Sequence, residues 1–196
     1  MRSISKMWFR LTRAVPDLLA DRRGMAAVEF AFILPVMMVM LFGTVEFSSA
    51  IAIDRKVTLM ARTLSDLTSQ ATTVSSSDLT NFFAASTGIM TPYPTTASTI
   101  LNSTITQLYV DNTLVAKVKW SQGSAPISVG ATVAIPTTLA IADTYLIYSQ
   151  VTYKYVPTVG YVLAKAGITM TDTAFTRPRQ STCVYYPTTG TSCPTS

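Results

Sequence analysis

Glu29 is the one charged side chain in an otherwise apolar stretch near the N-terminus. The twenty-one residues from Met25 to Val45 contain no other charge. A charged side chain at the centre of a lipid-facing helix costs about 2.5–3.5 kcal/mol. Glu29 lies only one turn inside the stretch, so its cost is smaller, but it still favours a positively charged partner. The chemistry that this residue offers is charge pairing at the edge of a membrane.

The rest of the sequence lacks the patterns of catalysis and metal binding. It has no histidine, which excludes histidine-based triads and histidine-ligated metals. It also has no Walker loop, GxGxxG or GxSxG motif. The acids beyond the apolar stretch stand singly, without paired-carboxylate or metal-loop spacing: Glu46, Asp54, Asp66, Asp78, Asp111, Asp143 and Asp172. We therefore expect no enzymatic activity, no cofactor and no metal.

The basic charge is concentrated at the N-terminus. Residues 1–24 hold six basic and two acidic side chains, whereas the remaining residues hold nine basic and eight acidic ones. A nucleic-acid-binding protein needs its basic patch on the folded domain, so we expect no nucleic-acid partner. Lys and Arg beside a membrane span stay in the cytoplasm. This rule predicts a cytoplasmic leader over residues 1–24 and an extracytoplasmic chain after about Glu46.

A single long helix is predicted from Met25 to about residue 69. Residues 25–46 reach the roughly 20 residues that a helix needs to cross a bilayer, which predicts a transmembrane helix. Pro35 and Gly43 are expected to bend or soften it. Residues 47–70 then form an amphipathic extension that can pack on a globular domain. Its apolar positions recur every three or four residues, at Ala50, Ile53, Val57, Met60, Leu64 and Leu67.

The remaining sequence predicts a connector and a sheet. Residues 71–104 form a Ser/Thr-rich connector, in which Asp78 is expected to cap a short helix. Residues 105–180 form the β domain, with β-rich runs at 105–110, 114–120, 131–135, 143–156 and 168–175. Short connections between these runs favour antiparallel pairing. A long helix followed by an antiparallel sheet is an α+β architecture.

The only two cysteines, Cys183 and Cys193, lie in the C-terminal tail, residues 181–196. In an oxidising periplasm we expect them to form a disulfide. The loop of about eleven residues that it closes is worth roughly 2.5–3 kcal/mol in the chain-entropy model. The spacing is not CxxC, which disfavours a redox motif.

A processing motif lies directly before the predicted helix. Residues 22–30 read Arg22-Arg23-Gly24-Met25-Ala26-Ala27-Val28-Glu29-Phe30. This resembles the cleavage site of type IV prepilins, where a membrane peptidase cuts after the glycine. Met25 departs from the phenylalanine that major pilins have after the cut. The resemblance implies that the leader, residues 1–24, is removed after Gly24, with Arg22, Arg23, Gly24 and Met25 as the processing site.

A longer run resembles one family more narrowly. Ala27 to Pro35 contains the Glu29-Phe30 pair with a proline six residues after the glutamate, and Gly43-Thr44-Val45-Glu46-Phe47 follows. This pattern is similar to the TadE-like minor pseudopilins of tight-adherence (Flp) pilus systems. Residues 151–157 and 177–179 resemble the ends of such proteins more loosely. The fold that this resemblance implies is pilin-like, with the long helix packed on the C-terminal sheet.

The resemblance implies a location, partners and a function. The chain would be a single-pass protein of the bacterial inner membrane with a periplasmic C-terminal domain, available for incorporation in the pilus. Its partners would be the prepilin peptidase, other pilin or pseudopilin subunits, the inner-membrane platform of the pilus and the lipid bilayer. Its function would be structural, in the assembly of a pilus that supports secretion, adherence and biofilm formation.

Glu29 and Phe30 are then expected to set assembly and register. Cleavage after Gly24 creates a free amine on Met25, and an α-amino group is largely protonated at neutral pH. Glu29 of one subunit can pair with the Met25 amine of its neighbour. The alternative is a carboxylate that sits at the interface, solvated or neutral.

Two other functions remain open. A single-pass envelope protein could use a tyrosine-rich sheet as an adhesin-like binding domain, because Tyr145, Tyr153 and Tyr155 share one face of a predicted strand. An exported enzyme released by signal peptidase could be cut near the small residues 48–52. The amphipathic stripe of the predicted helix continues across residues 48–52 without a break, which disfavours cleavage by signal peptidase there.

Overall fold

The computed structural model describes residues 24–96, 99–157, 167–187 and 193. They form two compact units that divide between Val45 and Glu46. Helix α2, Met25–Ser69, runs through both units and continues past Pro35. The predicted long helix is therefore present, and its two halves differ in their surroundings.

The second half of α2 is amphipathic and packs within the C-terminal unit. Its fully buried side chains include Ile53, Val57, Met60 and Leu64, which are predicted apolar positions. Small hydroxyl side chains let the helix approach the sheet closely. Ser149 Oγ donates to the backbone oxygen of Ala61 at 2.6 Å, and Ser65 Oγ donates to that of Ile147 at 3.2 Å.

Two short helices follow α2. Helix α3, Ser76–Thr87, begins with a capping box in which Ser75 is the N-cap. The backbone N–H of Ser75 donates to Asp78 Oδ2 at 2.9 Å. The prediction that Asp78 is the cap was therefore wrong: Asp78 is the third helical residue, and its carboxylate bonds back to the cap. The 3₁₀-helix η2, Gly88–Met90, continues from α3.

Lys56, a residue of α2, hydrogen-bonds to the backbone at the end of η2. Its ammonium donates to the backbone oxygen of Ile89 at 2.7 Å and to that of Thr91 at 2.9 Å. The side chain therefore bonds the carbonyl groups at the end of η2, which have no partner within the short helix.

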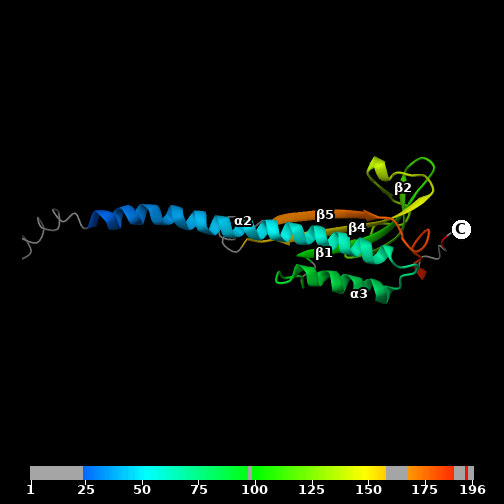
Figure 1. Ribbon diagram of the computed structural model, residues 1–196, viewed down its shortest axis with the longest axis horizontal. Helices are drawn as coiled ribbons and strands as arrows, with labels where there is room; N and C mark the ends of the chain where they lie inside the picture. The colour runs from blue at the N-terminus through cyan, green and yellow to red at the C-terminus, as the bar shows by residue number, and fades with distance from the viewer. Residues whose placement is uncertain (1–23, 97–98, 158–166, 188–192, 194–196) are drawn as a thin grey trace, which may run out of the picture. The chain divides into compact units, whose positions relative to one another are not determined.

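The sheet has five strands in the order β3-β2-β1-β4-β5, and all neighbours are antiparallel (Figure 1). The strands are β1 (Leu101–Val110), β2 (Ala116–Gly123), β3 (Thr132–Val133), β4 (Thr144–Tyr155) and β5 (Ile168–Thr176). Strand β1 begins four residues before the predicted boundary, because Leu101 pairs with Tyr153 of β4. The 3₁₀-helix η3, Thr137–Leu139, lies between β3 and β4. The α+β fold class is confirmed.

Both faces of the sheet are covered. The larger core cluster joins α2 and α3 to the face that presents Ile105, Ile147 and Val151. A smaller cluster lies on the opposite face and includes Leu108, Leu146 and Tyr148. Ile127, Val133, Ile135 and Leu139 from the connection between β2 and β4 pack against it. The packing of the helix on one face of the sheet was predicted from the sequence, whereas the cluster on the opposite face was not.

The C-terminal segment belongs to the larger core. Val184 is fully buried and Tyr186 is 3% exposed. Trp120 Nε1 donates to the backbone oxygen of Val184 at 3.0 Å, and the Val184 N–H donates to Gln107 Oε1 at 2.8 Å. Tyr185 also forms a parallel bridge with Thr73. Part of the predicted tail is thus an integral part of the β domain.

Candidate assembly site

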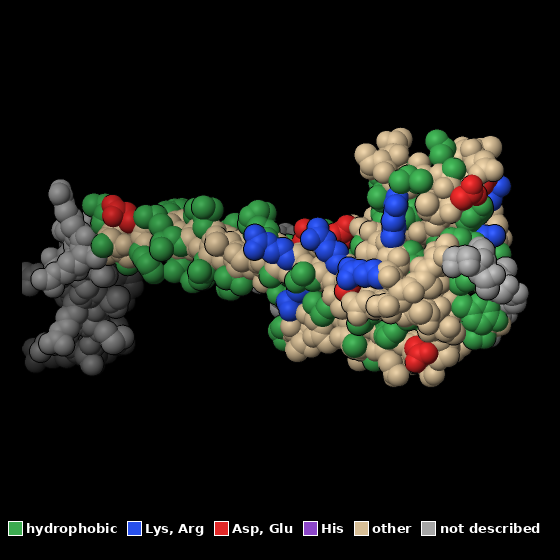
Figure 2. Space-filling view, turned by 45° about the vertical axis from the view of Figure 1, so that its right-hand side comes forward, with side chains coloured by type: hydrophobic (Ala, Val, Ile, Leu, Met, Phe, Trp, Pro, Cys, Tyr) green, Lys and Arg blue, Asp and Glu red, His purple; other side chains and the backbone are tan. Residues whose placement is uncertain are grey.

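The first half of α2 is apolar and exposed on all sides. Every residue from Gly24 to Val45 is exposed, and Phe32 reaches 76%. Figure 2 shows hydrophobic side chains along this part of the helix. The segment is long and apolar enough to cross a membrane. Apolar surface of this extent favours removal from water, so this segment is a candidate membrane anchor.

Glu29 is the fifth residue of this exposed helix. Among the residues that the structure describes, its carboxylate has no hydrogen-bond or ion-pair partner, and Phe30 beside it is 58% exposed. Gly24 and Met25 lie at the start of the helix. Arg22 and Arg23 fall outside the described residues. The arrangement leaves the carboxylate available to a partner from another molecule.

Glu46 is placed differently, at the start of the C-terminal unit. Tyr155, the last residue of β4, donates its phenolic hydrogen to Glu46 Oε2. Burial, and next the hydrogen bond to Glu46, raise the pKa of Tyr155 to about 12. The phenol therefore remains a donor at physiological pH and ties the end of the sheet to α2. Sequence reasoning missed this contact, which joins residues 109 positions apart.

Pro35 lies inside α2, and the helix continues on both sides of it. Proline removes one backbone donor and crowds the preceding turn, so the bend expected at this position remains a prediction. At Gly43, an added Cβ atom would meet nothing within 4 Å. A larger side chain would therefore fit at position 43, so a lack of space does not explain the glycine.

The structure joins Cys183 and Cys193 in a disulfide, with a Cα–Cα distance of 5.6 Å. Cys183 is 3% exposed and lies next to the buried Val184. The bridge therefore attaches Cys193 to a segment that is itself part of the core.

We expect protein taken from the periplasmic face to contain this disulfide. Alkylation of the thiols before and after reduction, read by intact mass, should label two cysteines only after reduction. Reduction should lower the free energy of unfolding by roughly 2.5–3 kcal/mol. Two free thiols in the unreduced protein would contradict the pairing.

The fold and site define a class: an α+β protein with a candidate single-helix membrane anchor at its N-terminus. The model of the family described as TadE-like protein matches residues 24–64. This confirms the resemblance that residues 27–47 suggested, and it associates the chain with the tight-adherence pilus system. No curated protein and no solved structure matches the chain.

Proposed function

We propose that this chain is a minor pseudopilin that is processed after Gly24 and takes part in building a tight-adherence pilus. The prepilin peptidase would remove the leader, α2 would anchor the product in the inner membrane, and the C-terminal unit would lie in the periplasm. The observation that carries the proposal is the exposed, apolar α2 segment with Glu29 as its only charge, inside a TadE-like match. Neighbouring pilin subunits and the inner-membrane platform would be its partners.

Assembly would give Glu29 the partner that it lacks among the described residues. A carboxylate enclosed among other helices is costly when it is unpaired, and a nearby cation offsets much of that cost. The Met25 amine created by cleavage supplies such a cation. Support for secretion, adherence and biofilm formation would follow from the pilus itself.

The adhesin-like alternative loses two of the three tyrosines that motivated it. Tyr153 is 2% exposed and Tyr155 is 9% exposed, because α2 covers this face of β4. Tyr145, the third, is half-buried, and its ring lies 5.0 Å from that of Tyr109. One half-buried pair is not the tyrosine-rich face that the binding function requires.

The mature protein is expected to begin at Met25. N-terminal sequencing and intact mass of protein extracted from native membranes measure this directly. A mass lower than that of the precursor by the 24 leader residues is the expected result. A mature chain that starts at Met1, Ile51 or Ile53 would contradict the pseudopilin proposal.

A further inference from the structure

Strand β5 is an edge strand, and the orientation of its backbone groups follows from the register. The Lys154 N–H donates to the backbone oxygen of Ile100 at 2.8 Å, so the even-numbered residues of β4 bond toward β1. The odd-numbered ones then bond toward β5, where Val151 is paired with Asp172. In an antiparallel ladder, the backbone N–H and C=O groups of two paired residues either point toward each other and bond, or both point away from each other. The outward-facing backbone groups of β5 therefore belong to Thr169, Thr171, Thr173 and Phe175.

The side chain of Asp172 binds one of these outward-facing backbone groups. The backbone N–H of Thr173 donates to Asp172 Oδ1 at 2.7 Å. This bond confirms that the Thr173 N–H has no strand partner. It also protects part of the edge, because a side-chain acceptor competes with any incoming strand.

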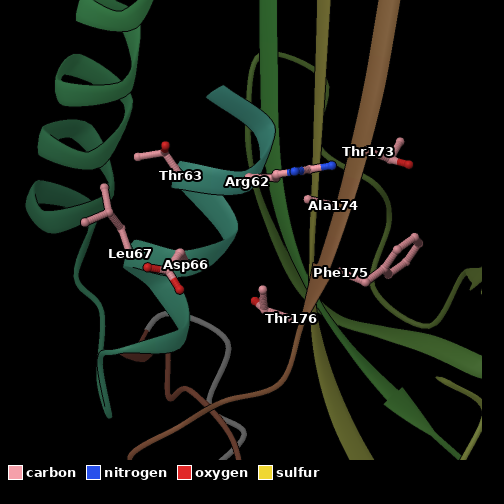
Figure 3. A pocket seen from close by; sticks show the side chains of 8 residues that line it. All are labelled: Arg62, Thr63, Asp66, Leu67, Thr173, Ala174, Phe175 and Thr176. Carbon is pink, nitrogen blue, oxygen red and sulfur yellow. The ribbon is translucent and has the colours of Figure 1, made fainter. Parts of the chain in front are cut away.

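A groove of about 570 Å³ runs beside this edge. It is lined by one turn of α2 and by the second half of β5: Arg62, Thr63, Asp66, Leu67, Thr173, Ala174, Phe175 and Thr176. Figure 3 shows Arg62 extending from α2 toward β5. An added strand beside β5 would lie against this flank of the helix.

The groove is lined by one basic and one acidic side chain, and among the described residues only the acidic one has a charged partner. Asp66 is already neutralised by an ion pair with Arg179, and its Oδ2 accepts from Gln70 Nε2 at 2.7 Å. Arg62 is exposed and has no ion-pair or hydrogen-bond partner within the described part of the chain. Its guanidinium offers five donors in a geometry that fits a carboxylate.

We propose that the β5 edge accepts an extended segment of a neighbouring subunit as an added strand, with an acidic side chain of that segment bound to Arg62. Main-chain bonds to an open edge supply affinity, and side-chain contacts supply specificity. That the partner is a pilus subunit rests on the proposed function. Its chemistry, an extended acidic polypeptide, rests on the outward backbone groups and on Arg62.

The partner strand is not β5 of a second copy. Symmetric antiparallel pairing over the full strand would place the two Asp172 residues directly opposite each other. Like charges at opposed positions destabilise such a pair. Asp172 thus disfavours self-pairing and leaves the edge to a different segment.

Two peptides test the proposal with the full chain purified in detergent. Each is a fluorescein-labelled nine-residue peptide of alternating threonine and valine, with either one glutamate or one lysine at its centre. Fluorescence anisotropy measures binding to the wild type and to three variants. Thr171→Pro removes an outward donor that Asp172 does not occupy and leaves the β4 ladder bonds in place. Arg62→Gln removes the guanidinium, and Arg55→Gln is the matched control outside the groove.

The wild type should bind the glutamate peptide about tenfold more tightly than the lysine peptide. Arg62→Gln should abolish this preference, Arg55→Gln should keep it, and Thr171→Pro should weaken the binding of both peptides. Equal binding of the two peptides by the wild type would overturn the proposal. So would unchanged binding by a Thr171→Pro variant that melts at the wild-type temperature. The start of the mature chain tests the pseudopilin proposal separately, since the peptide assay does not depend on processing.

Discussion

Glu29→Ala is expected to abolish pilus assembly while leaving synthesis, membrane insertion and cleavage intact. The substitution makes the exposed segment of α2 more apolar and leaves Gly24 untouched, so the anchor and the processing site are retained. It removes the carboxylate that is expected to bind the Met25 amine of the neighbouring subunit. A charge-assisted hydrogen bond is worth about 1.5–3 kcal/mol, which is about tenfold or more for each contact between subunits. Pilus yield and the ratio of precursor to mature protein in the native host measure the effect.

Two further variants separate charge from processing. Glu29→Gln keeps the shape of the side chain and loses its charge, so it should assemble nearly as poorly as Glu29→Ala. Gly24→Val should instead block cleavage directly. Precursor should then accumulate, and assembly should fail because no mature protein is made. Wild-type pilus yield from Glu29→Ala would show that Glu29 is a solvated interfacial residue and that the pairing between subunits is wrong.

Val184→Asp is expected to unfold much of the C-terminal unit. The side chain is fully buried and belongs to the larger core cluster. An unpaired charge in such a site costs about 3–5 kcal/mol, which is a large part of the 5–15 kcal/mol that stabilises a typical protein. Urea unfolding of the full chain in detergent, followed by the fluorescence of the buried Trp120, should show a clear fall in the midpoint.

Val129→Asp is the matched control, because the same substitution falls on a side chain that is 65% exposed. Its midpoint should stay close to the wild-type value, since surface substitutions usually change stability by less than about 0.5 kcal/mol. Equal midpoints for the two aspartate variants would mean that the Val184 segment does not belong to the core in solution.

The features that follow from local patterns could be predicted from the sequence. The helical spacing of Ile53, Val57, Met60 and Leu64 identified the buried stripe of α2, and all four are fully buried. The β-rich runs located the strands, because alternation and turn residues are local signals. The lone Glu29 stood out from composition alone, since a charge in an apolar stretch is rare.

The features that depend on tertiary contact could not be predicted. The C-terminal segment with Val184 and Tyr186 has no periodicity, so nothing in its sequence shows that Trp120 and Gln107 bond to its backbone. The Ser75 cap was missed because Ser75 and Asp78 are both good caps, and only the backbone decides between them. The groove beside Arg62 exists because α2 crosses the sheet near β5, and the pairing order of strands is not a local property.

The position of Val184 in the chain sets an order of events during biogenesis. The core that contains Ile53 and Leu64 also requires Val184 and Tyr186, which follow strand β5 and are therefore synthesised well after α2. The apolar segment of α2 therefore leaves the ribosome long before the C-terminal unit can complete its core. Until then, the core of the C-terminal unit lacks two of its buried side chains. We expect the candidate anchor to be synthesised first and the C-terminal unit to complete its core only after residues 184–186 have followed.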